Sequence, residues 1–262
     1  MMRSRNLSIK RWITSYLVWM AEKRLTTKCV RLETEREVMI SLCRNFRNLQ
    51  RAGIRRSITR GTFTRNNLDF SNDVLHFADL GFEQISIEPV VGEDTDPYAI
   101  RKEDLPKIFE EYDKLAKIMV ERERSGRGFT FFHFMIDLEG GPCVSKRLSG
   151  CGSGTEYLAI TPWGDLYPCH QFVGQEEFLM GNVDEGITHT EIADEFRGCS
   201  VYSKESCKNC FARFYCSGGC MANSYKFNHS INDTYEVSCE MERKRVECAI
   251  MIKAALADAD AQ

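Results

Sequence analysis

Seven of the twelve cysteines in this 262-residue chain have spacings typical of a metal site. Four of them follow the pattern Cys207-x2-Cys210-x5-Cys216-x3-Cys220, and Cys239 comes after eighteen further residues. A Cys-x2-Cys pair places two thiols on one tight turn, and the next spacings wrap more thiols around the same small volume. Thiolates so close together repel one another strongly once water is excluded. They need a soft metal as countercharge, either zinc or iron–sulfur.

The other two of the seven cysteines flank a predicted β-hairpin. Twelve residues separate Cys151 from Gly164, and four separate Gly164 from Cys169. Residues 156–168, EYLAITPWGDLYP, lie between these cysteines. Their sequence predicts strands at 157–161 and 166–167 around a turn at 162–165. Because a hairpin folds its ends together, both cysteines can face one metal site. By spacing alone, a pair of zinc knuckles and iron–sulfur clusters are equally good interpretations.

The amino-acid composition indicates the class of protein and the compartment in which these thiols occur. With 43% hydrophobic and 28% charged residues, the chain has the make-up of a soluble folded protein. No run approaches the ~18 apolar residues of a membrane helix, and no signal-peptide cleavage site follows the N-terminus. We therefore expect a cytoplasmic location, where thiols stay reduced. Twelve cysteines in a reduced chain again indicate metal.

Residues 1–56 differ from the rest in charge. They hold fourteen Lys and Arg against four Glu and no Asp, whereas the whole chain has a net charge of −3. A basic arm for nucleic acid or an acidic membrane is one interpretation, but no nucleic-acid-binding motif accompanies the charge. A helical cover or a partly disordered segment is a second. We favour a third, that this segment is not native and derives from a wrong reading frame. We expect neither nucleic acid nor membrane as a partner, and assign no role to Cys29 and Cys43.

From residue 57 onward the pattern predicts an α/β unit that positions the cysteine-rich part. Strands are expected at 57–64, 83–91 and 129–136, with a helix capped by Ser71 and ended by Gly81. A longer helix begins at Asp104, with Pro106 just inside it. Strand, helix and strand with short joints form a parallel βαβ unit. Three strands are too few for a closed barrel and suit the later part of a larger one.

The complete cysteine spacing resembles that of the SPASM domain of radical SAM peptide-modifying enzymes. It consists of Cys-x12-Gly-x4-Cys, then Cys-x2-Cys-x5-Cys-x3-Cys, then a last Cys. Two sequence segments are most similar to the SCIFF peptide maturases, which form thioether links in short Cys-rich precursor peptides. These segments are GCGSGTEYLAITPWGDLYPCHQFVG and CKNCFARFYCSGGCMANSY. The resemblance covers roughly residues 58–260. It implies an α/β fold: the C-terminal part of a partial (β/α) radical SAM barrel at 57–142, then a SPASM domain at 143–262, with a β-hairpin and helices around iron–sulfur clusters.

The same resemblance implies two auxiliary [4Fe–4S] clusters and their ligands. Cluster I would take Cys151, Cys169 and Cys220, and cluster II would take Cys207, Cys210, Cys216 and Cys239. Seven ligands leave one iron open, which in the closest family members is thought to hold a substrate cysteine. Cys143 is the competing fourth ligand of cluster I. The other two cysteines of this part, Cys199 and Cys248, are expected to be buried or incidental thiols.

No three of the twelve cysteines have the Cys-x3-Cys-x2-Cys spacing that holds the radical-generating cluster. S-adenosylmethionine and a third [4Fe–4S] cluster are therefore expected only in a complete enzyme, of which this chain would be the C-terminal portion, inactive alone. The resemblance implies a Cys-rich precursor peptide and an electron donor such as ferredoxin or flavodoxin as partners. The alternatives are a stand-alone iron–sulfur electron carrier or inactive fragment, and a zinc-binding interaction module.

Overall fold

The computed structural model describes residues 17–18, 58–138, 140 and 147–260. In the first half, a parallel sheet has the strand order β1-β2-β3-β4. The strands of this sheet are β1 (Leu17–Val18), β2 (Ile58–Phe63), β3 (Gln84–Pro89) and β4 (Thr130–Phe131). β2 and β3 pair along their whole lengths, which confirms the first two strands predicted from the sequence. β1 belongs to the basic segment, and it pairs in parallel with β2.

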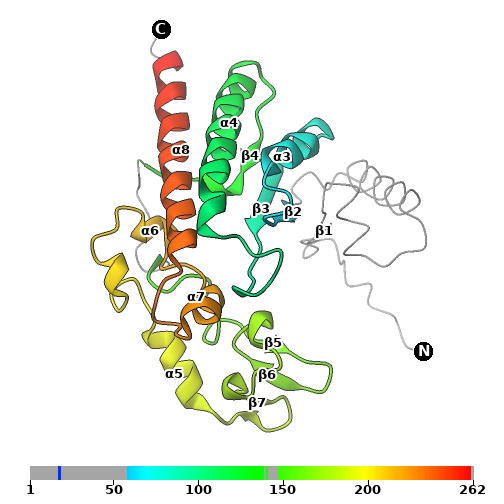
Figure 1. The fold of residues 1–262 in the computed structure, drawn as a ribbon, viewed down its shortest axis with the longest axis vertical. Helices are drawn as coiled ribbons and strands as arrows, with labels where there is room; N and C mark the ends of the chain where they lie inside the picture. Colours follow the sequence, from blue (N-terminus) through cyan, green and yellow to red (C-terminus); the bar gives the residue numbers. More distant parts are fainter. Residues whose placement is uncertain (1–16, 19–57, 139, 141–146, 261–262) are drawn as a thin grey trace, which may run out of the picture.

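Helices α3 (Phe70–Asp79) and α4 (Leu105–Arg124) follow β2 and β3 and complete two parallel crossovers (Figure 1). α4 begins directly after Asp104 and carries Pro106 in its first turn, as predicted, because proline needs no hydrogen-bond partner there. Ile108, Tyr112 and Leu115 recur at helical spacing and are fully buried. They pack with Phe63, Phe70 and other apolar side chains of the sheet and α3 into one core.

Two local predictions were wrong, and both errors have a tertiary cause. Ser71 does not cap α3, which starts one residue earlier; its hydroxyl donates instead to the buried Glu111 carboxylate of α4. The apolar run 129–136 forms only the short strand β4 and then a 3-10 helix, Phe132–Phe134. In this helix Phe134 is buried against the core while Phe132 points outward, so the run does not continue the strand.

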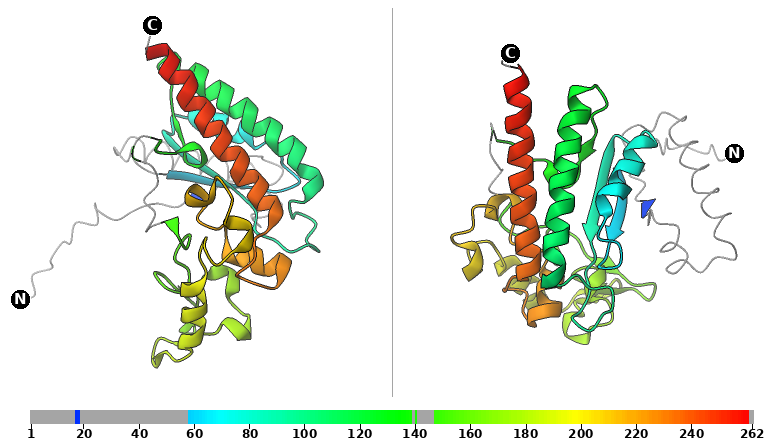
Figure 2. Two further views of the ribbon diagram at one scale, coloured as in Figure 1. Left: turned by 90° about the vertical axis from the view of Figure 1, so that its left-hand side faces the viewer. Right: turned by 45° about the horizontal axis from the view of Figure 1, so that its top comes forward.

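The C-terminal helix α8 (Glu236–Asp260) runs beside α4 and belongs to the same core (Figures 1 and 2). Met241, Cys248 and Ala249 of α8 are buried in it. The Arg245 guanidinium donates from Nε to the Tyr112 hydroxyl at 2.8 Å, and it pairs with Glu242. Because the start of α8 also carries Cys239, this helix ties the cysteine-rich half to the α/β half.

Residues 147–235 form the cysteine-rich half. Its antiparallel sheet contains β5 (Ala159–Ile160), β6 (Asp165–Tyr167), β7 (Gly181–Asn182) and β8 (Gly186–Ile187). Pairing of β5 with β6 confirms the predicted hairpin. The helices of this half are α5 (Thr190–Gly198), α6 (Arg213–Cys216) and α7 (Met221–Asn228). None of the helices in the described ranges is long and apolar enough to cross a membrane.

Candidate metal centre

The hairpin and the start of α7 bring together three thiols, which we call group I: Cys151, Cys169 and Cys220. Cys151 precedes the hairpin, Cys169 follows β6, and Cys220 is the N-cap of α7, accepting a hydrogen bond from the Asn223 amide. Burial raises the pKa of Cys169, and the charges of Cys220 and Cys151 raise it further. Cys151 and Cys220 therefore lie close enough to Cys169 for their charges to act on its thiol. Because Cys220 lies fifty-one positions after Cys169 in the sequence, the tertiary fold is what brings it to the hairpin.

The second set of thiols, group II, gathers around the start of α8: Cys207, Cys210, Cys216 and Cys239. Cys207 and Cys210 are the two ends of one turn, since the Cys210 amide donates to the Cys207 carbonyl at 3.2 Å. Cys216 ends α6, and Cys239 lies in the first turn of α8. Burial raises the pKa of Cys216 to about 12, with the charges of Glu242, Cys239 and Cys207 adding to the rise.

The chemistry of the two groups fits soft-metal ligation. Burial also raises the pKa of Cys207, Cys220 and Cys239, and in each case a thiol of the same group adds to it. Such thiols stay protonated until a cation replaces their protons, because like charges repel in a site with little water. Within the described part of the chain, no three His, Cys, Asp or Glu side chains are arranged to hold a single metal ion. Ligation by the seven cysteines stays a prediction.

The two remaining cysteines of the described residues are buried in hydrophobic cores, and Cys199 lies near Cys207 of group II. Cys199 is fully buried in the core of the cysteine-rich half, and its thiol donates to the Ile231 carbonyl at 3.1 Å. Cys248 is buried in the α/β core, 3.7 Å from a carboxylate oxygen of Asp113. Cys143, the competing ligand of cluster I, lies outside the described residues, as do Cys29 and Cys43.

Tyr157 lies beside group I, although the sequence analysis considered it only as a strand residue. Its hydroxyl lies 3.8 Å from the Cys151 sulfur. Burial raises its pKa, and the charges of Cys151, Cys169 and Cys220 raise it further. Tyr157 is therefore a neutral hydrogen-bonding group at the thiols of group I. The signal in the sequence was its position, six residues after Cys151 at the start of the hairpin segment.

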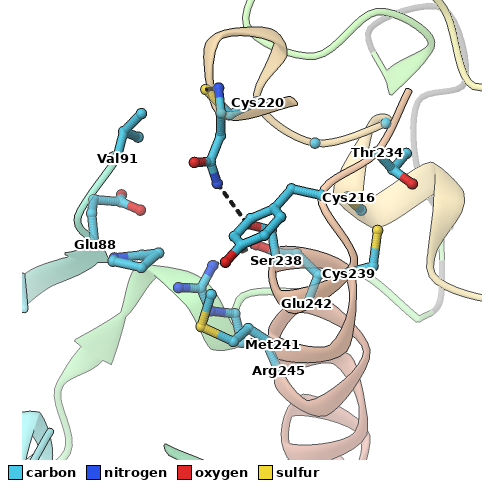
Figure 3. Close-up of a pocket in the computed structure, with 15 residues that line it drawn as sticks. Glu88, Val91, Cys216, Cys220, Thr234, Ser238, Cys239, Met241, Glu242 and Arg245 are labelled. Carbon is cyan, nitrogen blue, oxygen red and sulfur yellow. Dashed lines mark hydrogen bonds and ion pairs between the residues drawn. The ribbon is translucent and has the colours of Figure 1, made fainter. Parts of the chain in front are cut away.

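A pocket of about 270 Å³ lies between the end of β3 and the start of α8 (Figure 3). Cys220 of group I and Cys216 and Cys239 of group II line it, so the pocket adjoins both groups. Glu88 lines the opposite side, at the carboxyl end of its strand, and Figure 3 shows Arg245 reaching toward it from α8. The carboxyl ends of parallel strands are the usual place for ligands in α/β folds.

Two buried polar side chains of this pocket have an atom without a hydrogen-bond partner among the described residues. These atoms are Nη2 of Arg245, a donor, and Oδ1 of Asn223, an acceptor. Arg245 is 4% and Asn223 7% exposed, so the missing partners are not replaced by open solvent. The Asn223 amide nitrogen donates to the Ser238 hydroxyl at 2.7 Å, which orients its oxygen. Unsatisfied buried polar atoms are rare in folded proteins and call for an explanation.

Comparison with known proteins agrees with this architecture. Residues 151–211 match the SPASM family, described as an iron–sulfur cluster-binding domain. An uncharacterized protein of Archaeoglobus fulgidus is 31% identical over 129 residues, which are 46% of this chain and 31% of that protein. The matching segment thus spans about a third of that relative.

Two solved structures of anSMEcpe share the fold at low sequence identity. Histidine-tagged anSMEcpe with bound AdoMet superposes with a TM-score of 0.58 at 19% identity, over 79% of this chain and 55% of that one. Native anSMEcpe with bound AdoMet and Cp18Cys peptide gives a TM-score of 0.55 at 17% identity, over 77% of this chain and 58% of that one. The chain spans about half the length of anSMEcpe. Residues 151–211 are therefore similar to the SPASM iron–sulfur cluster-binding domain, within a mixed α/β structure similar to that of anSMEcpe.

Proposed function

We propose that this chain is the cluster-bearing part of a radical SAM peptide maturase, which forms thioether links between cysteine sulfur and carbon in a Cys-rich precursor peptide. The observation that carries the proposal is the gathering of seven thiols into groups I and II, four of which lie in the segment 151–211 that matches an iron–sulfur cluster-binding domain. Group I would hold one [4Fe–4S] cluster and group II the other. Three thiols in group I leave one position open for a substrate cysteine.

The chain's own residues prepare the two sites for that chemistry. When bound, the clusters supply an iron that accepts a thiolate and an acceptor for the electron released as sulfur joins a carbon radical. The raised pKa values of Cys169, Cys207, Cys216, Cys220 and Cys239 keep these five thiols protonated until metal arrives. The Tyr157 hydroxyl can donate to a sulfur in group I. Because no cysteines have the Cys-x3-Cys-x2-Cys spacing, we assign the radical-generating step to none of these residues. A ferredoxin or flavodoxin is the proposed electron donor, in the cytoplasm.

The pocket between β3 and α8 supports a peptide as the substrate. A peptide group offers one acceptor and one donor, which complement the unpartnered Arg245 Nη2 and Asn223 Oδ1. The pocket also contains two carboxylates, Glu88 and Glu242, against the single guanidinium. That excess of negative charge disfavours an anionic ligand and favours a neutral amide. A native anSMEcpe structure also contains a bound peptide, Kp18Cys, together with AdoMet.

Metal analysis of the protein prepared without oxygen tests the proposal. We expect about eight iron and about eight sulfide per chain, the content of two four-iron clusters, and a brown colour that bleaches on reduction. About two zinc per chain with no sulfide would instead establish the zinc-binding module and end the iron–sulfur proposal. Given S-adenosylmethionine and a reductant, this chain alone should release no 5′-deoxyadenosine.

Replacing Asn223 with Leu tests the peptide site. Leu has a similar volume and lacks the acceptor, so we expect the Kd for a synthetic Cys-rich peptide to rise about five- to tenfold, the loss of one buried hydrogen bond. Isothermal titration against the iron-loaded protein measures this. Asn72→Leu, on the exposed surface of α3, is the matched control and should leave the Kd unchanged. Equal affinity of wild type and Asn223→Leu would exclude Asn223 from peptide binding.

A further inference from the structure

The Lys204 side chain is a buried cation between the two thiol groups. Only 2% of the residue is exposed. Its ammonium donates to the Gly218 carbonyl at 3.0 Å and to the Asp233 carbonyl at 2.9 Å. Both acceptors are neutral, and no ion pair among the described residues includes Lys204. The Cys199 thiol also lies beside the ammonium, whose charge opposes the rise that burial causes in the pKa of Cys199. A buried ammonium without a countercharge is costly, even when hydrogen-bonded.

The contacts of Lys204 join both groups. Gly218 lies in the loop between Cys216 of group II and Cys220 of group I, where the three intervening residues all have positive φ. Lys204 therefore holds the loop that carries one thiol of each group. The backbone of Lys204 also contacts group II, because its carbonyl accepts a hydrogen bond from the Cys207 amide at 3.1 Å. Burial raises the pKa of both Cys207 and Cys220, and the Lys204 charge opposes that rise in each, so the ammonium acts on a thiol of either group.

We propose that Lys204 is the countercharge shared by the two auxiliary cluster sites, and that it raises the reduction potential of both clusters. The inference depends on the proposed function, since it requires that groups I and II bind clusters. Thiolate ligands make each site negative on loading, and each electron added makes it more negative. A fixed positive charge in a region of low dielectric stabilises the reduced state most. The cost of burying Lys204 in the iron-free protein would thereby be offset in the loaded protein.

A purely structural lysine would behave differently from a countercharge. If Lys204 only held the Gly218 and Asp233 carbonyls in place, its loss would weaken the iron-free and the loaded protein alike. A countercharge stabilises the loaded form more than the iron-free form, and it shifts the reduction potentials according to its charge. Lys204→Met removes the charge at similar length, whereas Lys204→Arg keeps it. Lys208→Met is the matched control, because Lys208 is exposed, adjoins Cys207 in sequence and pairs with Glu205.

The experiment is a reductive titration of the iron-loaded proteins, followed by electron paramagnetic resonance. We expect Lys204→Met to lower both midpoint potentials, Lys204→Arg to restore them, and Lys208→Met to leave them at the wild-type values. Thermal unfolding of the same variants should show a larger loss of stability for Lys204→Met in the loaded protein than in the iron-free protein, where only the hydrogen bonds to the Gly218 and Asp233 carbonyls are lost. Unchanged midpoints in fully loaded Lys204→Met, or equal stability losses in both forms, would overturn the inference. A wild type that binds no iron would overturn the proposed function instead.

Discussion

Cys216→Ala is expected to lower the iron content from about eight to about four atoms per chain, with sulfide falling in parallel. Cys216 lies among the group II thiols, and burial raises its pKa to about 12. A buried site with one missing thiolate cannot complete its ligand set, whereas group I, on the other side of the loop 217–219, keeps its three cysteines. Iron and sulfide analysis after anaerobic purification measures the change, and the spectrum of the cluster that remains identifies it as the one held by group I.

Cys248→Ala is the matched control for that experiment. Cys248 is also buried, and burial raises its pKa to about 12 as well, but it lies in the α/β core between α4 and α8. If a thiol contributes only to packing, its replacement should leave the iron content of the protein unchanged. If both variants lost the same amount of iron, the loss would reflect general destabilisation, and the assignment of Cys216 as a ligand would be wrong.

Removal of iron by a chelator is expected to loosen the cysteine-rich half and leave the α/β half folded. The segment 199–220 is held mainly by turns, with α6 its short helix. Where a metal site forms only when such turns are folded, the free energy of metal binding stabilises the folded turns. We expect amide protection in 199–220 to fall by about a hundredfold or more, equivalent to about 2.7 kcal/mol of local stability.

Hydrogen exchange measured by mass spectrometry, before and after chelation, tests this expectation segment by segment. The internal reference is α4, whose residues Tyr112 and Leu115 are fully buried in a core without any group I or group II thiol. Protection in α4 should stay the same in both forms. Equal protection of 199–220 with and without metal would show that protein contacts alone organise the thiols.

Strong local patterns predicted several elements correctly. β2, β3, the start of α4 and the hairpin β5–β6 each have a short-range signal: an apolar run, a proline in the first helical turn, or a turn sequence between two strands. The apolar run at 129–136 led to the wrong prediction of a long strand, because a continuous apolar run indicates burial but does not determine the backbone conformation. Ser71 misled for another reason, since its hydroxyl hydrogen-bonds to Glu111 on a helix that lies forty residues further along the chain.

For the candidate site, the spacing of the cysteines determined which thiols belong to one turn or one hairpin, because short loops leave the backbone few alternatives. Only the tertiary structure decided what surrounds them: Tyr157 at group I, Lys204 under the loop of Gly218, and the unpartnered atoms of Arg245 and Asn223 in the pocket. Each of these depends on elements distant in sequence packing side by side. Such contacts arise from burial in a shared core, which no local spacing encodes.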